Sequence, residues 1–124
     1  MQQTALPKTV LIVEDNELSM RLFCALIESQ GYDVLRARDA TEALALARQH
    51  RPHLIIMDVQ LPEVSGLVAA KWIKEDVDLK AIPIVAVTAM LGQEKASSEA
   101  GCEAHVLKPI SVVSFLKTVE RLLK

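Results

Sequence analysis

The sequence predicts a single α/β domain in which a five-stranded parallel sheet is covered by helices on both faces. Five short apolar runs alternate with five longer amphipathic segments along the chain, and this alternation is typical of a parallel sheet. The chain has 124 residues, of which 51% are hydrophobic and 24% are charged. These values fit one globular domain with an ordinary core and argue against disorder. Because parallel crossovers are right-handed, few topologies remain possible.

The first half of the chain contains two strand–helix pairs. Thr9–Val13 is a β-branched run, which predicts a buried strand. A helix is predicted over Asn16–Gln30, where a glycine follows as a typical helix end. Asp33–Ala37 predicts a weaker strand. The alanine-rich segment Ala40–His50 predicts a second helix, which a proline two residues further on prevents from continuing.

The centre of the chain contains a third pair and a fourth strand. His53–Met57 predicts a third buried strand, and Val59–Gly66 predicts a loop because it contains proline and glycine. Leu67–Glu75 predicts a helix. The apolar run Ile82–Val87 predicts the fourth strand.

The last elements are a polar helix, a strand and a C-terminal helix. Gly92–Ala100 is a weak helix former with few apolar side chains to bury, so we expect a short or mobile helix there. Ala104–Leu107 predicts the fifth strand. Ser111–Lys124 predicts the final helix, with Ser111 as its N-cap.

Composition excludes several classes of function. The net charge of −2 argues against a large basic face for nucleic acid, and 3% aromatic residues are too few for a base-stacking platform. No apolar run approaches the roughly 18 residues needed to span a bilayer, and no signal peptide is visible. We therefore expect a cytoplasmic protein with no membrane insertion and no direct DNA binding. Its two cysteines, Cys24 and Cys102, are expected to be reduced thiols.

The residues that follow the predicted strands carry the chemistry. The carboxyl ends of parallel strands meet at one edge of the sheet, where open α/β sheets bind ligands. Taken in chain order, the polar residues at these ends are Glu14, Asp15, Asp58, Thr88 and Lys108. Alone, each would more often be a helix cap or a solvated side chain. Their occurrence at the ends of four different strands favours a functional set.

This set of residues fits the binding of a metal ion and a phosphoryl group. Carboxylates in one cleft repel each other, and a hard cation such as Mg²⁺ relieves the repulsion. Lys108 can act as a point charge and Thr88 as a donor to phosphoryl oxygens. A carboxylate can itself accept a phosphoryl group. Because Asp58 follows an apolar strand and precedes a loop, we expect its side chain to lie exposed on the floor of the cleft.

Four segments make the sequence similar to the receiver domain of two-component response regulators over nearly its whole length. These segments are Leu11–Asn16, Met57–Gly66, Val87–Ala89 and Lys108–Ile110. The resemblance implies a flavodoxin-like doubly wound sandwich with strand order 2-1-3-4-5. The segments Glu14–Phe23, Lys71–Asp76 and Lys108–Phe115 are similar, within that family, to single-domain regulators of cell division.

The resemblance also implies a domain organisation. We expect residues 1–8 to form an N-terminal extension and residues 9–124 to form the receiver domain, with no output domain. The chain would then be a stand-alone receiver that signals through contacts with downstream proteins.

The resemblance assigns Asp58 as the phosphoryl acceptor. The donor would be the phosphohistidine of a sensor histidine kinase or a histidine phosphotransfer protein. Glu14, Asp15, Asp58 and the backbone carbonyl of Gln60 match the ligands of Mg²⁺. With this metal the family catalyses its own phosphorylation and dephosphorylation, so the protein is expected to be a signalling phosphoacceptor rather than an enzyme acting on other substrates.

Further residues match the parts of the family that grip the phosphoryl group and respond to it. Thr88 and Lys108 match the gripping residues, and Lys108–Pro109 matches a peptide bond that is cis in the family. Thr88 is expected to move toward the new oxygens. His105 stands where receivers usually have a tyrosine or phenylalanine that turns inward with this movement. It can serve as a smaller ring with the same role, as an exposed strand residue, or as a pH-sensitive switch.

The first predicted helix has more apolar side chains than one buried face needs. Leu18, Met20 and Leu22 are expected to dock a partner helix, because the family uses this helix to bind kinases and phosphotransfer proteins. The alternative is that neighbouring elements cover the whole helix.

Three other functions compete with the stand-alone receiver. The chain could be a receiver fragment of a larger hybrid kinase or regulator. It could be a phosphorylation-independent interaction module, which the presence of Asp58, Thr88 and Lys108 opposes. It could be a Mg²⁺-dependent phosphatase with an aspartyl intermediate, which is opposed by Gln60 at the position of the second catalytic acid.

Overall fold

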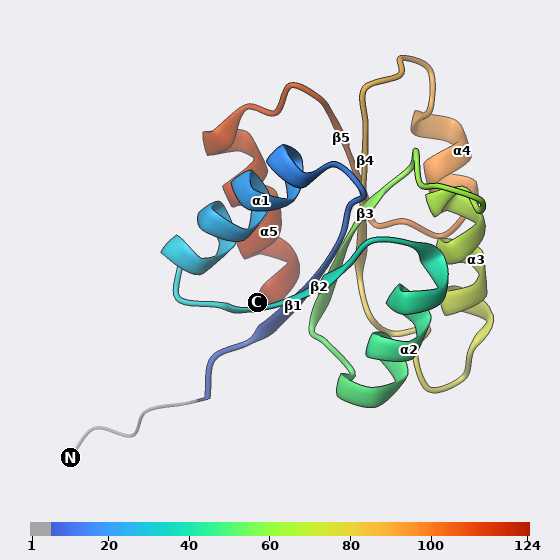
Figure 1. Cartoon of the computed structure of the whole chain (residues 1–124), viewed down its shortest axis with the longest axis horizontal. Coiled ribbons are helices and arrows are strands. Elements are labelled where there is room, and N and C mark those ends of the chain that lie inside the picture. The colour runs from blue at the N-terminus through green and yellow to red at the C-terminus, as the bar shows by residue number, and fades with distance from the viewer. Residues whose placement is uncertain (1–5) are drawn as a thin grey trace.

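The computed structural model describes residues 6–124, so the first five residues of the expected N-terminal extension lie outside the described residues. The sheet has five parallel strands in the order β2-β1-β3-β4-β5 (Figure 1). The strands are β1 (Thr9–Val13), β2 (Asp33–Ala37), β3 (Leu54–Asp58), β4 (Ile84–Thr88) and β5 (Ala104–Leu107). The predicted fold class and the strand order implied by the family resemblance are confirmed.

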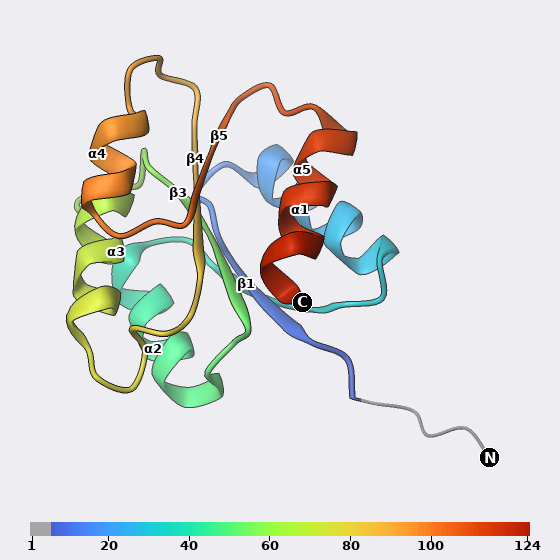
Figure 2. The same ribbon diagram turned by 180° about the vertical axis from the view of Figure 1, so that it is seen from behind.

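Five helices form the two outer layers. They are α1 (Glu17–Ser29), α2 (Ala40–His50), α3 (Gly66–Glu75), α4 (Glu94–Glu99) and α5 (Val112–Leu123). Helices α1 and α5 cover one face of the sheet, and α2, α3 and α4 cover the other (Figures 1 and 2). Within the described residues, no helix combines the length and apolarity that a membrane span requires.

The core consists of two apolar layers separated by the sheet. The central strands β3 and β4 are buried along their whole length, as expected for parallel strands covered on both faces. Successive side chains of β1 point to opposite layers, so Leu11 packs with the α2 and α3 side and Val10 with the α1 and α5 side. On the latter side the rings of Phe23 and Phe115 join α1 to α5, with centroids 5.4 Å apart.

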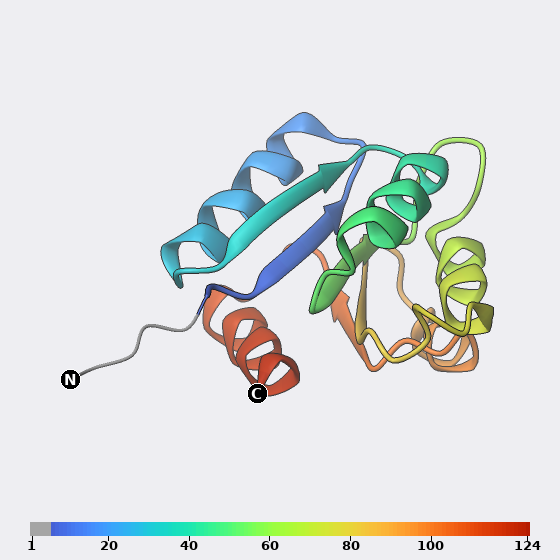
Figure 3. The same ribbon diagram turned by 90° about the horizontal axis from the view of Figure 1, so that it is seen from below.

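The strand register aligns the carboxyl ends of the strands at one edge. All strands run in the same direction between the two helical layers (Figure 3). Asp58 is paired with Val87, and Thr88 is paired with Leu107. The ends of β3 and β4 therefore lie side by side, as the positions of the polar residues predicted.

The bounds of two strands differ from the prediction at both ends, since β3 is Leu54–Asp58 rather than His53–Met57 and β4 is Ile84–Thr88 rather than Ile82–Val87. β4 begins at Ile84 rather than Ile82, because the Ile82 amide donates to the Leu79 carbonyl in a turn, and the next residue is a proline without an N–H. β3 runs one residue further than predicted and ends with Asp58 itself. This last difference changes the environment of the acidic side chain.

Four of the five helices begin one or two residues from the predicted position. Ser111 is the N-cap residue of α5, as predicted, although its side chain makes no capping hydrogen bond. Its backbone carbonyl instead starts the helix by accepting from the Phe115 amide. α4 is shorter than the predicted Gly92–Ala100 span, because its N-cap Gln93 provides no side-chain bond and the helix buries only Ser97. The expectation of a short fourth helix is confirmed.

Candidate functional site

Three of the predicted site residues converge at the carboxyl edge of the sheet. The Lys108 Nζ lies 2.7 Å from the Glu14 Oε1 and 3.7 Å from the Asp58 Oδ2. Glu14 immediately follows β1, Asp58 ends β3 and Lys108 immediately follows β5. Parallel topology thus brings together residues that are up to 94 positions apart in the chain.

The Asp58 side chain is buried, which corrects the prediction that it lies exposed. The residue is only 5% exposed. It is the last residue of β3 rather than the first of a loop, and α3 begins directly against it. A Cβ atom on Gly66, the first residue of α3, would lie 1.9 Å from the Asp58 backbone oxygen. The backbone N–H of Gln60 also donates a hydrogen bond to the Asp58 Oδ1 over 3.1 Å.

Burial and a second carboxylate change the acidity of Asp58. Its pKa is raised from 3.8 to about 7, first by burial and then by the hydrogen bond and the negative charge of Glu14. The Gln60 backbone amide and the Lys108 ammonium oppose this rise in pKa. One ammonium group therefore does not neutralise two buried carboxylates, and the site favours a further positive charge.

Asp15 does not join the two buried carboxylates. It is exposed, whereas the preceding Glu14 is 2% exposed, because successive side chains of an extended segment point to opposite sides. Over residues 6–124, no three His, Cys, Asp or Glu side chains are gathered in the manner of metal ligands. Asp15 is thus left exposed, while two of the three expected carboxylates, Glu14 and Asp58, form a buried pair. The oxygen-only chemistry of this pair, with the nearby Gln60 carbonyl, still fits a hard cation.

The Gln60 side chain links the ends of β3 and β4. Its Oε1 accepts a hydrogen bond from the Thr88 Oγ1 over 3.3 Å and from the Ala89 amide over 3.4 Å. The hydroxyl of the fully buried Thr88 in turn accepts from the Met90 amide over 3.0 Å. Sequence reasoning placed Gln60 in the cleft, as a backbone ligand and at the position of a second catalytic acid, but no sequence pattern indicates that its side chain bonds to Thr88 and Ala89.

An apolar hollow of about 400 Å³ adjoins the Lys108 side chain. The Lys108–Pro109 peptide bond is cis, as the resemblance implied. The hollow lies between α1 and the β5–α5 connection, and it is lined by Ser19, Leu22, Phe23, Ala89, Lys108, Pro109, Ile110 and Val112. It is therefore a surface feature that touches both the acid cleft and the first helix.

The exposed side of α1 contains two of the three predicted docking residues. Leu18 is 76% exposed and Leu22 is 47% exposed, one turn apart on the same side of the helix. Met20 is 7% exposed and packs in the core with Phe23. The prediction for Met20 is wrong because a position two residues from Leu18 is rotated by about 200° around a helix, toward the sheet.

His105 points inward against α4. Its Nδ1 lies 3.0 Å from the Oγ of Ser97, and its Nε2 lies 3.5 Å from the Oε1 of Glu94. The His105 side chain is 14% exposed, and its buried Nε2 has no hydrogen-bond partner in the described part of the chain. Of the three roles considered for this residue, that of an exposed strand residue is therefore excluded.

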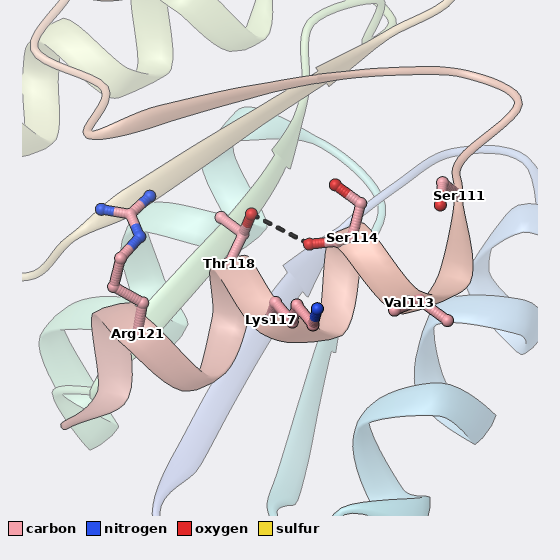
Figure 4. Close-up of a pocket in the computed structure, with 6 residues that line it drawn as sticks. All are labelled: Ser111, Val113, Ser114, Lys117, Thr118 and Arg121. Carbon is pink, nitrogen blue, oxygen red and sulfur yellow. Dashed lines mark hydrogen bonds between the residues drawn. The ribbon is translucent and has the colours of Figure 1, made fainter.

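A second hollow, of about 410 Å³, lies on the outer side of α5. Its lining residues project from one helix, as Figure 4 shows, and they are Ser111, Val113, Ser114, Lys117, Thr118 and Arg121. The Thr118 hydroxyl donates to the Ser114 carbonyl over 3.1 Å. No carboxylate lines this hollow, so it does not provide a second phosphoryl-acceptor site.

Comparisons with known proteins identify the family of the chain. The family model for the response regulator receiver domain matches residues 10–120. The polar-differentiation response regulator DivK of Brucella anthropi is 56% identical over 117 residues, which cover 93% of this chain and 95% of that protein.

Two solved structures extend the comparison to the fold. A response regulator structure from Chloroflexus aurantiacus superimposes with a TM-score of 0.91 at 28% identity, covering 95% of this chain and 98% of that one. The receiver domain of a sensor histidine kinase from Pseudomonas aeruginosa superimposes with a TM-score of 0.87 at 28% identity, covering 95% and 98% of the two chains. That structure holds a magnesium ion in its active-site cleft.

Proposed function

The chain belongs to the response regulator receiver domain family, and from this premise we propose that Asp58 accepts a phosphoryl group from a phosphohistidine. The single observation that carries the proposal is the buried Asp58, held between the Glu14 carboxylate and the Lys108 ammonium at the end of β3. The donor is a sensor histidine kinase or a histidine phosphotransfer protein. The phosphorylated protein then signals through altered contacts with downstream proteins.

The transfer is a displacement at phosphorus. A carboxylate oxygen of Asp58 forms a new P–O bond while the P–N bond to the donor histidine breaks, and the electron pair of that bond returns to the imidazole. Asp58 must be deprotonated to attack, and in the metal-free protein its pKa is about 7. Lys108 and the Thr88 hydroxyl supply positive charge and a hydrogen bond to the phosphoryl oxygens.

Mg²⁺ fits the chemistry of the acidic pair. Glu14 and Asp58, the Gln60 carbonyl and the exposed Asp15 are the residues that would hold it. When bound, the ion would neutralise the carboxylates and the incoming phosphoryl oxygens. Its positive charge would also lower the pKa that burial and Glu14 raise. Self-catalysed hydrolysis of the acyl phosphate is part of the same proposal.

The exposed face of α1 is proposed as the surface that meets the phosphodonor. Leu18 and Leu22 are apolar and exposed, and Leu22 also lines the hollow beside Lys108. A partner helix laid over this face would bury apolar area within reach of the acid cleft. The similarity to DivK supports a role in cell-division or differentiation signalling. The cytoplasmic location expected from the sequence stays a prediction.

The two receiver alternatives differ in their support. Similarity to a kinase receiver domain is compatible with a fragment of a hybrid kinase, but the relative that shares 56% identity has 95% of its length covered. This favours the single-domain regulator. The phosphorylation-independent module is separated from the main proposal only by experiment.

Intact-mass measurement after incubation with acetyl phosphate and Mg²⁺ tests the proposal. We expect one phosphoryl adduct on the wild type, none on Asp58→Asn and none without metal. If neither acetyl phosphate nor a phosphorylated histidine phosphotransfer protein phosphorylates the wild type, the phosphorylation-independent module becomes the better account.

A further inference from the structure

We propose that the Gln60 side chain is a positioning residue that competes with the phosphoryl group for its hydrogen-bond donors. The inference deepens the proposed function and rests on it. It starts from one juxtaposition, in which a single oxygen, the Gln60 Oε1, accepts from both the Thr88 hydroxyl and the Ala89 amide.

The two donors each have one hydrogen to give. Thr88 is fully buried, and its hydroxyl oxygen already accepts from the Met90 amide, so its O–H hydrogen is the only donor it has left. The Ala89 amide likewise has one N–H. Both hydrogens are used by Gln60 in the unphosphorylated protein. Neither can bind a phosphoryl oxygen at full strength until Gln60 releases it.

The same residue is tied to the acceptor side of the cleft. The Gln60 backbone amide donates to the Asp58 Oδ1 over 3.1 Å, two positions along the chain. The side chain therefore spans from the Asp58 loop to the end of β4 and holds Thr88 and Ala89 in the unphosphorylated arrangement. When a phosphoryl group on Asp58 takes these donors, the link between the two loops is broken.

Removing the Gln60 side-chain oxygen should favour the phosphorylated state. Removing the Gln60 acceptor leaves the buried Thr88 hydroxyl without its partner in the unphosphorylated state, and buried donors without partners are unfavourable. Because the two bonds to Gln60 exist only in the unphosphorylated state, their removal favours the phosphorylated state. Because the two bonds are long, at 3.3 and 3.4 Å, we expect an effect of about three- to tenfold on affinity.

Equilibrium binding of beryllofluoride in the presence of Mg²⁺ tests the inference without interference from hydrolysis. Beryllofluoride mimics a phosphoryl group on a carboxylate, and binding can be followed through the amide resonances of Ala89 and Met90. The variant is Gln60→Met, which keeps the side-chain length but has no acceptor oxygen. Gln49→Met on α2 is the matched control, since it makes the same exchange at an exposed site away from the cleft.

We expect Gln60→Met to bind beryllofluoride about three- to tenfold more tightly than the wild type and Gln49→Met to bind like the wild type. In the absence of beryllofluoride, the Ala89 amide of Gln60→Met should already resonate away from its wild-type position, because its acceptor is gone. Unchanged or weaker binding by Gln60→Met, with normal binding by the wild type, overturns the role of Gln60. If neither the wild type nor Gln49→Met binds beryllofluoride, the proposed function fails and this inference fails with it.

Discussion

The strands that end at the acid cleft and the neighbouring α4–β5 region are packed very differently. The strands β3 and β4, which carry Asp58 and Thr88, are buried at every position. Helix α4 has six residues and buries only Ser97, while β5 is an edge strand with no fully buried residue. Packing thus leaves little freedom to the strands that carry Asp58 and Thr88. Helix α4, which contacts His105 through Ser97, is packed more lightly.

This contrast explains how a small charge change can have a distant effect. Under the proposed function, a phosphoryl group on Asp58 would alter the hydrogen bonds of Thr88 and Ala89, which precede α4 by a few residues in the chain. Because β3 and β4 are buried at every position and α4 buries only Ser97, we expect α4 to be the element that rearranges.

The largest effect is expected at Gly66, on the cleft side. In Gly66→Ala the new Cβ would lie 1.9 Å from the Asp58 backbone oxygen, so α3 or β3 must shift. We expect the free energy of unfolding to fall by about 3 kcal/mol or more, measured by urea denaturation. Gly31→Ala is the control, because Gly31 has a φ of 86° but nothing within 4 Å of the added atom. Its loss should stay near 1 kcal/mol, about the cost of a left-handed backbone. Equal losses in the two variants would show that the close approach at Asp58 is not limiting.

The next effect concerns the charge of Asp58 in metal-free protein. Its folded-state pKa of about 7 lies above its ordinary value of 3.8, so the folded state binds the proton more tightly than the unfolded state. This contribution to stability is fully present below pH 4 and is lost as the pH rises from about 4 through about 7. Above that pH the buried charge is unfavourable.

Asp58→Asn removes this pH dependence. At pH 8 without metal the variant should exceed the wild type in unfolding free energy by on the order of a few kcal/mol, and the difference should shrink toward pH 4. Denaturation at several pH values measures both profiles. Parallel profiles would mean that Asp58 titrates normally in the folded protein. Added Mg²⁺ should narrow the gap at pH 8 by stabilising the wild type alone.

A smaller effect is expected on the α4 side. Ser97→Ala removes the hydrogen bond to the His105 Nδ1, which joins α4 to β5. We expect a loss of about 1 kcal/mol in global stability, and faster amide hydrogen exchange confined to α4 and β5. Ser98→Ala is the matched control, because Ser98 is exposed on the same helix. A loss of protection in Ser97→Ala that also reached β3 would contradict the separation of the two regions.

The smallest effect on the folded protein is expected at Leu18. This side chain is 76% exposed, so Leu18→Ala should change the free energy of unfolding by no more than about 0.5 kcal/mol. The rate of phosphotransfer from a histidine phosphotransfer protein should fall, while phosphorylation by acetyl phosphate stays unchanged. Met20→Ala, which opens the core, should instead cost about 2 kcal/mol or more. Equal phosphotransfer rates for Leu18→Ala and wild type would remove α1 as the docking surface.

The fold, and which residues lie at the site, could be predicted from the sequence because both depend on the pattern of apolar runs. Alternating apolar runs predict the sheet, and parallel strands bring Asp58, Thr88 and Lys108 to one edge. The conformation of individual side chains has no such signal. The burial of Asp58 depends on one extra residue of β3 and on the close start of α3 at Gly66.

Other details of the site depend on local geometry in the same way. Asp15 is separated from Glu14 by a single peptide unit, and that step turns its side chain to solvent. The apolar character of Met20 could not distinguish a docking residue from a core residue, since both are apolar and only the helix rotation separates them. The Gln60 bond to Thr88 joins the β3–α3 loop to the end of β4 across 28 residues of chain, and no sequence pattern encodes it.

The central claim is that phosphorylation at the well-packed cleft is expressed in the lightly packed α4–β5 region. Hydrogen–deuterium exchange of the wild type with and without saturating beryllofluoride and Mg²⁺ tests it most directly. The account predicts altered exchange over residues 88–108 and unchanged exchange in β2 and α2. Two results would contradict it. One is unchanged exchange over residues 88–108 when beryllofluoride fully occupies Asp58, and the other is an equal change of exchange in every element.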